Sequence, residues 1–276
     1  MSVSIILSTY NQPEWLRLTL LGYISQIYTN IEIVIADDGS SKETCDLIEN
    51  FKSLTSLPIK HIWQPDEGFR KCRILNKAIE SADGKYLIFS DGDCVPRNDF
   101  VEVHNKHAEK GYFLSGGYFK LPLVTSKRVT KERISSGECF ERSWLNANGV
   151  PRTLKLLKLT RSNLIASIFN SITPTKRTWN GHNASCWKTD AKKVNGFDER
   201  MKYGGEDVEF GCRLVNSGLK AKQVRYLAPC LHLEHSRGYV NDESLNANLA
   251  IRKTTLNNKI QCTKYGIFQA TNIPNS

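Results

Sequence analysis

The stretch Tyr86-Leu87-Ile88-Phe89-Ser90-Asp91-Gly92-Asp93 places two carboxylates, one residue apart, directly after a short apolar run. The run is too short and too rich in β-forming residues for a helix, so it predicts a buried parallel strand. Two acids at the end of such a strand cannot both stay buried as unpaired anions, because their desolvation would cost more than packing returns. Hard oxygen ligands favour Mg²⁺ or Mn²⁺, which often bridge to phosphate oxygens. The pattern therefore indicates a metal site, with a solvated turn as the alternative.

Strand and helix signals alternate through the first hundred residues. Strands are predicted at residues 3–8, 31–36 and 59–63, and apolar residues with helical spacing separate them. Repeated βα units predict a parallel sheet with helices on both faces, and ligands of such sheets bind beyond the carboxyl ends of the strands. Asp37-Asp38-Gly39 and Asp91-Gly92-Asp93 both lie at such ends. We therefore expect the two motifs to line one crevice.

The pattern changes after residue 100. A further strand is predicted at residues 113–119 and a helix at residues 153–172. The helix carries an apolar stripe, which fits either packing on the domain or lying on a membrane surface. The stripe consists of Leu154, Leu157, Leu164, Ile165, Ile168, Phe169 and Ile172, while Leu156 and Leu159 fall outside it.

The formal charge of +10 is concentrated in the middle of the chain. Residues 120–161 hold ten Lys and Arg side chains against Glu132, Glu138 and Glu141. A patch of this kind attracts nucleic acid, anionic lipid or a phosphorylated substrate, and charge alone does not choose among them.

Length and composition are those of a globular protein. The 276 residues suffice for a substantial core, and a hydrophobic content of 40% is ordinary for a globular chain. Neither a secretory signal nor an apolar stretch long enough for a bilayer is found. We therefore expect a cytoplasmic protein, with a peripheral position at the inner face of the membrane as a further option. The eight cysteines include no C-x-x-C pair, which favours reduced core thiols over a zinc or disulfide framework.

Four local patterns share one explanation. They are Ser8-Thr9-Tyr10-Asn11, Asp37-Asp38-Gly39-Ser40, Asp91-Gly92-Asp93 and Tyr203-Gly204-Gly205-Glu206-Asp207. Together they resemble the GT-A glycosyltransferases of family 2, and the resemblance covers nearly the whole chain. Residues 180–184, 196–199 and 205–207 resemble the carboxyl-terminal region shared by Golgi β-galactosyltransferases and bacterial chondroitin-type polymerases.

The resemblance implies an α/β chain with the GT-A fold. In that fold a Rossmann-like, nucleotide-binding sheet, mixed but mainly parallel, is flanked by helices. The implied parts are a nucleotide-sugar-binding half at residues 1–100, an acceptor-binding and catalytic half at residues 101–240, and a helical tail at residues 241–276. All three would belong to one GT-A domain.

The resemblance also implies a nucleoside site made of Ser8, Tyr10, Asp38 and Asp91. Tyr10 would stack on the base, Asp38 would accept a hydrogen bond from uracil N–H, and Asp91 would face the ribose. An Asx-turn before the following helix is the alternative role for Asp38.

A metal site is implied at Asp93, where Mn²⁺ or Mg²⁺ would bridge the two phosphates of the donor and neutralise charge on the departing UDP. His235, within Leu233-Glu234-His235-Ser236-Arg237, would supply a further ligand, as it does in galactosyltransferases that carry His-Ser-Arg at this point. His232 is the alternative ligand.

Asp207 is implied as the general base that takes the proton from the acceptor hydroxyl, and Glu206 as the residue that holds the acceptor sugar. Attack from the face opposite UDP would invert the anomeric centre, and such base assistance is typically worth about 10²–10⁴ in rate. The alternative for both acids is capping, because carboxylates at a helix N-terminus are stabilised by its dipole.

Two positions depart from the family pattern. Tyr203 stands where many relatives carry Trp ahead of Gly-Gly-Glu-Asp, which puts the acceptor-stacking surface in doubt. Leu75 stands where relatives often carry Arg before Asn76, so Lys71 or Arg73 is left as the candidate for contact with the diphosphate.

The predicted function is metal-dependent, inverting transfer of a hexose from UDP-galactose, UDP-glucose or an N-acetylated form to a glycan, in surface polysaccharide or lipopolysaccharide synthesis. The expected partners are a UDP-sugar and a glycan or lipid-linked saccharide, without nucleic acid. One alternative is a sugar nucleotidyltransferase, which normally carries an early glycine-rich loop with Arg and Lys. The others are a basic nucleic-acid-binding protein and a glycoside hydrolase, which needs no nucleotide pocket.

Overall fold

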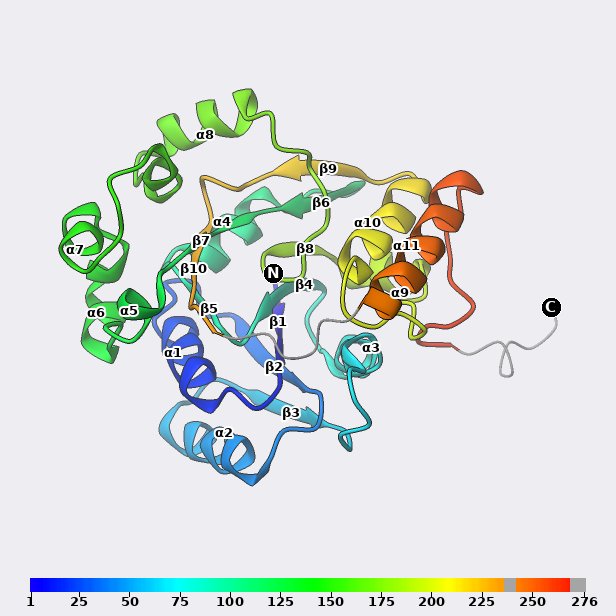
Figure 1. Cartoon of the computed structure of the whole chain (residues 1–276), viewed down its shortest axis with the longest axis horizontal. Coiled ribbons are helices and arrows are strands. Elements are labelled where there is room, and N and C mark those ends of the chain that lie inside the picture. Colours follow the sequence, from blue (N-terminus) through cyan, green and yellow to red (C-terminus); the bar gives the residue numbers. More distant parts are fainter. Residues whose placement is uncertain (236–241, 269–276) are drawn as a thin grey trace.

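A computed structural model of the protein describes residues 1–235 and 242–268. Its centre is a seven-stranded sheet with the order β3-β2-β1-β4-β8-β6-β9, and helices lie on both of its faces (Figure 1). The strands are β1 (Val3–Thr9), β2 (Ile31–Asp37), β3 (Ile59–Trp63), β4 (Tyr86–Asp91), β6 (Tyr112–Ser115), β8 (Ala184–Trp187) and β9 (Lys220–Gln223).

The sheet is mixed but mainly parallel, as the sequence predicts. Strands β3, β2, β1 and β4 run parallel to one another, and β6 is parallel to β9. Only β8, between β4 and β6, is antiparallel to its neighbours. The carboxyl ends of β1, β2 and β4 therefore meet at one edge of the sheet.

Side chains of alternate strand residues pack into two separate hydrophobic cores. Ile5 and Ile88 point into the core that is shared with helices α1 (Pro13–Ile24), α2 (Lys42–Leu54) and α4 (Phe100–His107). Ile6 and Phe89 point into the opposite core. The helices on that side are α3 (Lys71–Ser81), α9 (Lys188–Lys193), α10 (Glu206–Asn216) and α11 (Asp242–Asn257). The strict alternation follows from the pleat of a strand, which sends successive side chains to opposite faces.

A second, three-stranded sheet has the order β5-β10-β7. It consists of β5 (Cys94–Pro96), β7 (Gly117–Lys120) and β10 (Pro229–His232). The single strand expected at residues 113–119 is wrong, because the chain changes from the large sheet to the small one at Gly116. The N–H of Gly116 donates to the carbonyl of Asn183, and a Cβ at this glycine would lie 2.0 Å from Oδ1 of Asn183.

The basic segment forms short helices beside the small sheet. They are α5 (Leu123–Ser126), α6 (Lys131–Ser136), η1 (Glu138–Phe140), α7 (Arg142–Ala147), η2 (Leu154–Leu159) and α8 (Asn163–Ile172). Residues of α6, η1, α7 and η2 form a third core, whereas the buried Ala166 of α8 belongs to the core that α1, α2 and α4 share.

The single helix expected at residues 153–172 is also wrong. It is divided into the 3₁₀ helix η2 and the α-helix α8, because Thr160 leaves the helical conformation and the hydroxyl of Ser162 caps α8 by accepting from the N–H of Ile165. The buried leucines of η2 are Leu156 and Leu159, which lie outside the predicted stripe.

All eight cysteines are free thiols, as expected, and five of them are buried. In the described part of the chain, no helix combines the length and the apolar character that crossing a membrane requires. The three-part division at residues 1–100, 101–240 and 241–276 stays a prediction. Residues 236–241 and 269–276, which include its last boundary and Ser236 and Arg237 of the histidine motif, lie outside the described residues.

Candidate active site

The parallel register brings the polar ends of three strands together. Ser8 pairs with Asp91, and Thr9 pairs with Asp37, so the end of β1 lies between the two acidic motifs. The Ser8 hydroxyl donates to Oδ1 of Asp91 over 2.6 Å. The expectation that both motifs lie at one edge of the sheet agrees with this arrangement.

Asp91 is also held by a lysine that begins α3. Nζ of Lys71 lies 2.8 Å from Oδ1 of Asp91. Burial alone would raise the pKa of Asp91, but the Lys71 ammonium and the Ser8 hydroxyl lower this pKa below its ordinary value. Burial would conversely lower the pKa of Lys71, but the charges of Asp91, Asp207 and Glu206 hold it well above its ordinary value. Lys71 is therefore kept as a cation by its ion pair with Asp91 and by the charges of Asp207 and Glu206.

The predicted metal ligands Asp93 and His235 lie side by side. Nε2 of His235 is 2.7 Å from Oδ2 of Asp93, and Nε2 of His232 is 3.6 Å from the same oxygen. The two imidazoles stack with their ring centroids 5.8 Å apart. Strand pairing explains the convergence, since β10 runs antiparallel to β5 with His232 opposite Cys94. The ligand atoms of Asp93, His232 and His235 all lie within 4.8 Å of one another, a spacing that suits one cation.

One carboxylate and two imidazoles are ligands that Mn²⁺ and other first-row divalent cations accept. Ligand atoms of Asp91, Asp93 and Cys94 form an overlapping group within the same 4.8 Å limit, so Asp91 also stands beside the candidate metal position. The residues thus fit a divalent cation, and nitrogens of both His232 and His235 belong to the group that could hold it.

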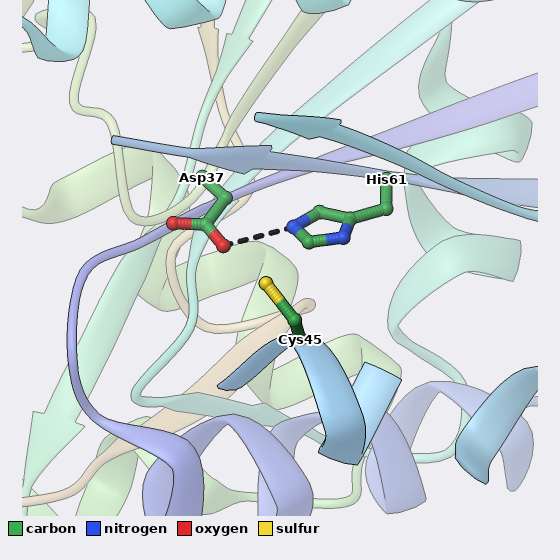
Figure 2. A group of neighbouring side chains, drawn as sticks. All are labelled: Asp37, Cys45 and His61. Atoms are coloured by element: carbon green, nitrogen blue, oxygen red, sulfur yellow. Dashed lines mark hydrogen bonds and ion pairs between the residues drawn. The ribbon is translucent and has the colours of Figure 1, made fainter. Parts of the chain in front are cut away.

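A third group that satisfies the same spacing is made of Asp37, Cys45 and His61 (Figure 2). Its hydrogen bonds give it a structural role. One oxygen of Asp37 lies 2.8 Å from Nε2 of His61, and the other accepts from the N–H of Ser40. Burial raises the pKa of the Cys45 thiol, which disfavours the thiolate. The group orders the turn that carries Asp38.

Asp38 is buried and bound on both oxygens. Oδ1 accepts from the Gln64 amide over 2.7 Å, and Oδ2 accepts from the N–H of Arg70 over 2.8 Å. Burial raises the pKa of Asp38, and these two donors oppose that rise. Tyr10 stands at the surface nearby, half-exposed, and its hydroxyl donates to Oδ2 of Asp66. Asp38 therefore joins the loops after β2 and β3, and each of its oxygens keeps a second lone pair for a ligand.

The predicted base lies at the N-terminus of α10. Oδ2 of Asp207 accepts from the N–H of Gly181 over 2.8 Å, whereas its buried Oδ1 has no hydrogen-bond partner among residues 1–235 and 242–268. Burial raises the pKa of Asp207, and Lys71 opposes that rise. Glu206 accepts from the N–H of Gly204, and burial together with the charge of Asp207 raises the pKa of Glu206 to about 7.

Two residues near the site were missed or left unranked by sequence reasoning. Lys71 and Arg73 were the two candidates for the diphosphate; the structure pairs Lys71 with Asp91, whereas Arg73 pairs with Glu67 at the surface. His182 lies edge-on to Tyr118, and burial lowers the pKa of His182 to about 4. The only sequence signal for His182 was its place in the 180–184 motif. The Tyr203 ring packs edge-to-face on Phe69, with ring centroids 5.8 Å apart.

Several curated proteins are similar to this chain. The chondroitin synthase of Pasteurella multocida is 28% identical over 241 residues, which is 78% of this chain and 23% of that protein. The chondroitin synthase of Escherichia coli is 26% identical over 238 residues, 80% of this chain and 33% of that protein. A UDP-Glc:alpha-D-GlcNAc-diphosphoundecaprenol beta-1,3-glucosyltransferase of E. coli is 33% identical over 120 residues, 42% of this chain and 46% of that protein. The chain thus spans less than half the length of each of these relatives.

Solved structures share the fold. The mannosyltransferase PcManGT of Pyrobaculum calidifontis, in complex with GDP-Man and Mn²⁺, has a TM-score of 0.59 at 19% identity, covering 86% of this chain and 58% of that one. Residues 1–349 of TarS from S. aureus, in complex with UDP-GlcNAc, have a TM-score of 0.60 at 17% identity, covering 94% of this chain and 69% of that one. These likenesses confirm the expected GT-A fold.

Family models match most of the chain. The model for glycosyl transferase family 2 matches residues 4–191, and the model described as the N-terminal domain of galactosyltransferase matches residues 168–236. The two matches overlap and between them include every predicted site residue. The chain belongs to glycosyl transferase family 2.

Proposed function

We propose that the protein is a metal-dependent, inverting glycosyltransferase that transfers a hexose from a UDP-sugar to a glycan. The observation that carries the proposal is that Lys71, which lies 2.8 Å from Asp91, is also close enough to Asp207 and Glu206 for their charges to raise its pKa. Residues assigned to the donor and residues assigned to the acceptor therefore lie near one shared cation. A glycosidic bond can form only where the two substrates meet in this way.

The donor site is assigned to Ser8, Tyr10, Asp38 and Asp91. The exposed ring of Tyr10 offers a stacking surface for the base, and Asp38 offers a fixed acceptor for uracil N–H. A uridine nucleotide is supported by relatives and neighbours, since one relative is named as using UDP-Glc and TarS binds UDP-GlcNAc.

Asp93, His232 and His235 are assigned as metal ligands, with Mn²⁺ or Mg²⁺ as the ion. Lewis-acid stabilisation of the departing diphosphate is the chemistry that such an ion supplies when bound. Mn²⁺ is present in the complexes of PcManGT and GalNAc-T7, which supports the assignment. Lys71 adds a fixed positive charge beside Asp91, where the diphosphate would lie.

Asp207 is assigned as the general base. Its Oδ1, which lacks a partner among the described residues, can accept the hydrogen of an acceptor hydroxyl, while Gly181 N–H holds Oδ2 in place. The charge of Lys71 favours the ionised form that base catalysis requires. Direct attack on the face opposite UDP inverts the anomeric centre. Glu206 is assigned to hold the acceptor sugar.

The acceptor class is assigned as a growing glycan or a lipid-linked saccharide. Two chondroitin synthases and a glucosyltransferase named for a diphosphoundecaprenol-linked sugar are among the relatives. A lipid-linked acceptor would require the enzyme to work beside a membrane.

A panel of UDP-hexoses with Mn²⁺ tests the proposal, with thermal shift and slow UDP release as readouts, because a ligand that binds the folded state raises its melting temperature. Asp207→Asn should keep the Mn²⁺–UDP shift and lose transfer by about 10²–10⁴-fold. Asp93→Asn should lose the Mn²⁺-dependent part of the shift. Asp46→Asn, an exposed acid on α2, is the matched control. Full turnover by Asp207→Asn, or no shift with any UDP-sugar, would refute the proposal.

A further inference from the structure

Several large aliphatic side chains of η2 and α8 face solvent, although Leu156 and Leu159 of η2 are buried. Leu154 is 84% exposed, Leu164 72% and Ile172 68%, and Ile165 and Ile168 are also exposed. Figure 1 shows α8 at the rim of the molecule. Its buried residues are Ala166 and Asn170 alone. Monomeric proteins rarely leave a contiguous patch of large aliphatic side chains in water, so this one requires a partner.

The segment that carries the patch is basic. Residues 142–189 contain no Asp or Glu. The exposed cations of this stretch that form no ion pair within the described residues are Arg142, Arg152, Lys155, Lys176 and Arg177. By contrast Arg161, between η2 and α8, is neutralised by Glu141 at 2.7 Å. Unpaired cations in the same segment as exposed aliphatic side chains are complementary to a surface that is negative at its edge and apolar beneath.

A pocket of about 310 Å³ lies at the start of η2. It is lined by two arginines, a threonine and three leucines: Arg142, Arg152, Thr153, Leu154, Leu156 and Leu157. Guanidinium groups bind phosphate oxygens in a bidentate manner, and leucine side chains exclude water from the adjoining wall. The pocket thus combines, in one place, the two chemistries of a phospholipid: an anionic phosphate and the apolar chain that follows it.

We propose that η2, α8 and the following Lys176 and Arg177 form a membrane-docking surface for an anionic phospholipid bilayer. The unpaired cations need a surface of opposite charge, which the headgroups of anionic lipids provide. The exposed patch is purely aliphatic, which argues against single-stranded nucleic acid, since bases are held by aromatic stacking; Phe169 packs on Tyr226 instead. The docked helix lies in the plane of the membrane with Leu164, Ile168 and Ile172 among the acyl chains.

A short segment of chain connects the docking surface to the residue that holds the candidate base. Nine residues lead from Ile172, the end of α8, to Gly181, whose N–H holds Asp207. At about 3.3–3.6 Å per residue, the base lies within roughly 30 Å of the membrane-facing helix. A saccharide carried on a membrane lipid can be presented over such a distance. This consequence rests on the proposed function, whereas the docking itself does not.

Vesicle flotation of the full chain tests the docking surface. Vesicles of phosphatidylcholine alone are compared with vesicles in which about a third of the lipid is phosphatidylglycerol. Each basic residue close to an anionic surface strengthens the binding of the protein roughly fivefold. The wild type should float with the anionic vesicles only. Arg152→Gln/Lys155→Gln/Lys176→Gln should weaken this binding roughly 100-fold. Leu164→Ser/Ile168→Ser/Ile172→Ser should weaken it by a similar factor or more.

Matched controls carry the same changes at other surfaces. Lys85→Gln/Lys193→Gln/Lys253→Gln removes three exposed lysines, and Leu54→Ser removes a leucine that is 70% exposed on α2. Both controls should bind anionic vesicles like the wild type, and all variants should keep the wild-type melting temperature. Equal binding to both kinds of vesicle, or unchanged binding by the two test variants, would overturn the proposal. So would a stable dimer in sedimentation velocity that the aliphatic variant dissociates, because a second copy would then cover the surface. The UDP-sugar shift without vesicles reports on the proposed function separately.

Discussion

The ammonium of Lys71 lies 2.8 Å from Oδ1 of Asp91, and the same charge acts on Asp207 and Glu206. These acids come from β4 and from the start of α10, more than a hundred residues apart. Like charges so close together cannot all ionise in a buried site unless a cation lies among them. Lys71 is that cation in the absence of substrate.

Lys71→Met should therefore change the pH dependence of transfer. Since Lys71 opposes the rise in the pKa of Asp207, its removal raises this pKa further, and the acidic limb of the pH–rate profile moves to higher pH. Lys71→Arg should restore the limb, because it returns the charge. A profile of Lys71→Met that keeps the wild-type shape would show that Lys71 does not act on the base.

Glu206 should make unfolding stability depend on pH. Its folded-state pKa of about 7 lies above the ordinary value for Glu, so the folded protein holds this proton more tightly than the unfolded chain. The associated stability is complete below the unfolded pKa and is lost as pH rises towards 7, by at most about 3 kcal/mol. Glu206→Gln should remove this loss. Urea unfolding of both proteins between acid and neutral pH measures it, and parallel stability curves would contradict the prediction.

His235→Ala should weaken Mn²⁺ binding in the presence of UDP. Changes around a metal site typically cost 10–100-fold in affinity, and loss of a direct ligand should cost at least about that. His61→Ala is the informative comparison, because His61 belongs to the separate Asp37 group. Calorimetric titration with Mn²⁺ measures the affinity of each variant for the ion. A larger loss in His61→Ala than in His235→Ala would move the metal site to the Asp37 group.

Asp38→Asn should reduce the affinity for UDP. Gln64 and the N–H of Arg70 both donate to this side chain, so an amide would turn one donor towards another and leave a buried group unsatisfied. The cost is about 1–3 kcal/mol, or roughly 10–100-fold in binding if the loop must reorder around the nucleotide. Fluorescence titration with UDP measures the change. Wild-type affinity in the variant would favour a purely local, turn-forming role for Asp38.

Gly116→Ala should destabilise the junction between the two sheets. The added Cβ would meet Oδ1 of Asn183 at 2.0 Å, and the buried Asn183 amide also donates to the carbonyls of Gly117 and Ala228. We expect a loss of about 1–3 kcal/mol, as in other overpacked cores. Gly117→Ala is the control, because its Cβ would meet the flexible side chain of Arg225 at 2.8 Å. Equal melting temperatures for the two variants would contradict this account.

The N-terminal half could be predicted because its signals are local. Each parallel strand is a short apolar run, and the acids at Asp37 and Asp91 follow from where the runs end. The prediction of a single helix at residues 153–172 was wrong because its signal was ambiguous. Leucines occupy both sides of this segment, so periodicity could not tell which of them the third core would bury.

The sequence by itself determined the family, the mainly parallel sheet and the edge at which its acidic motifs meet. These features follow from local patterns, because repeated βα units predict parallel strands and each acidic motif directly follows a predicted strand. Only the tertiary structure decided that Lys71 rather than Arg73 lies among the acids, that His232 and His235 both reach Asp93, and that α8 turns its aliphatic face outward. Those outcomes depend on contacts between residues far apart in the chain. Such contacts arise from the packing of whole elements, and no local pattern encodes them.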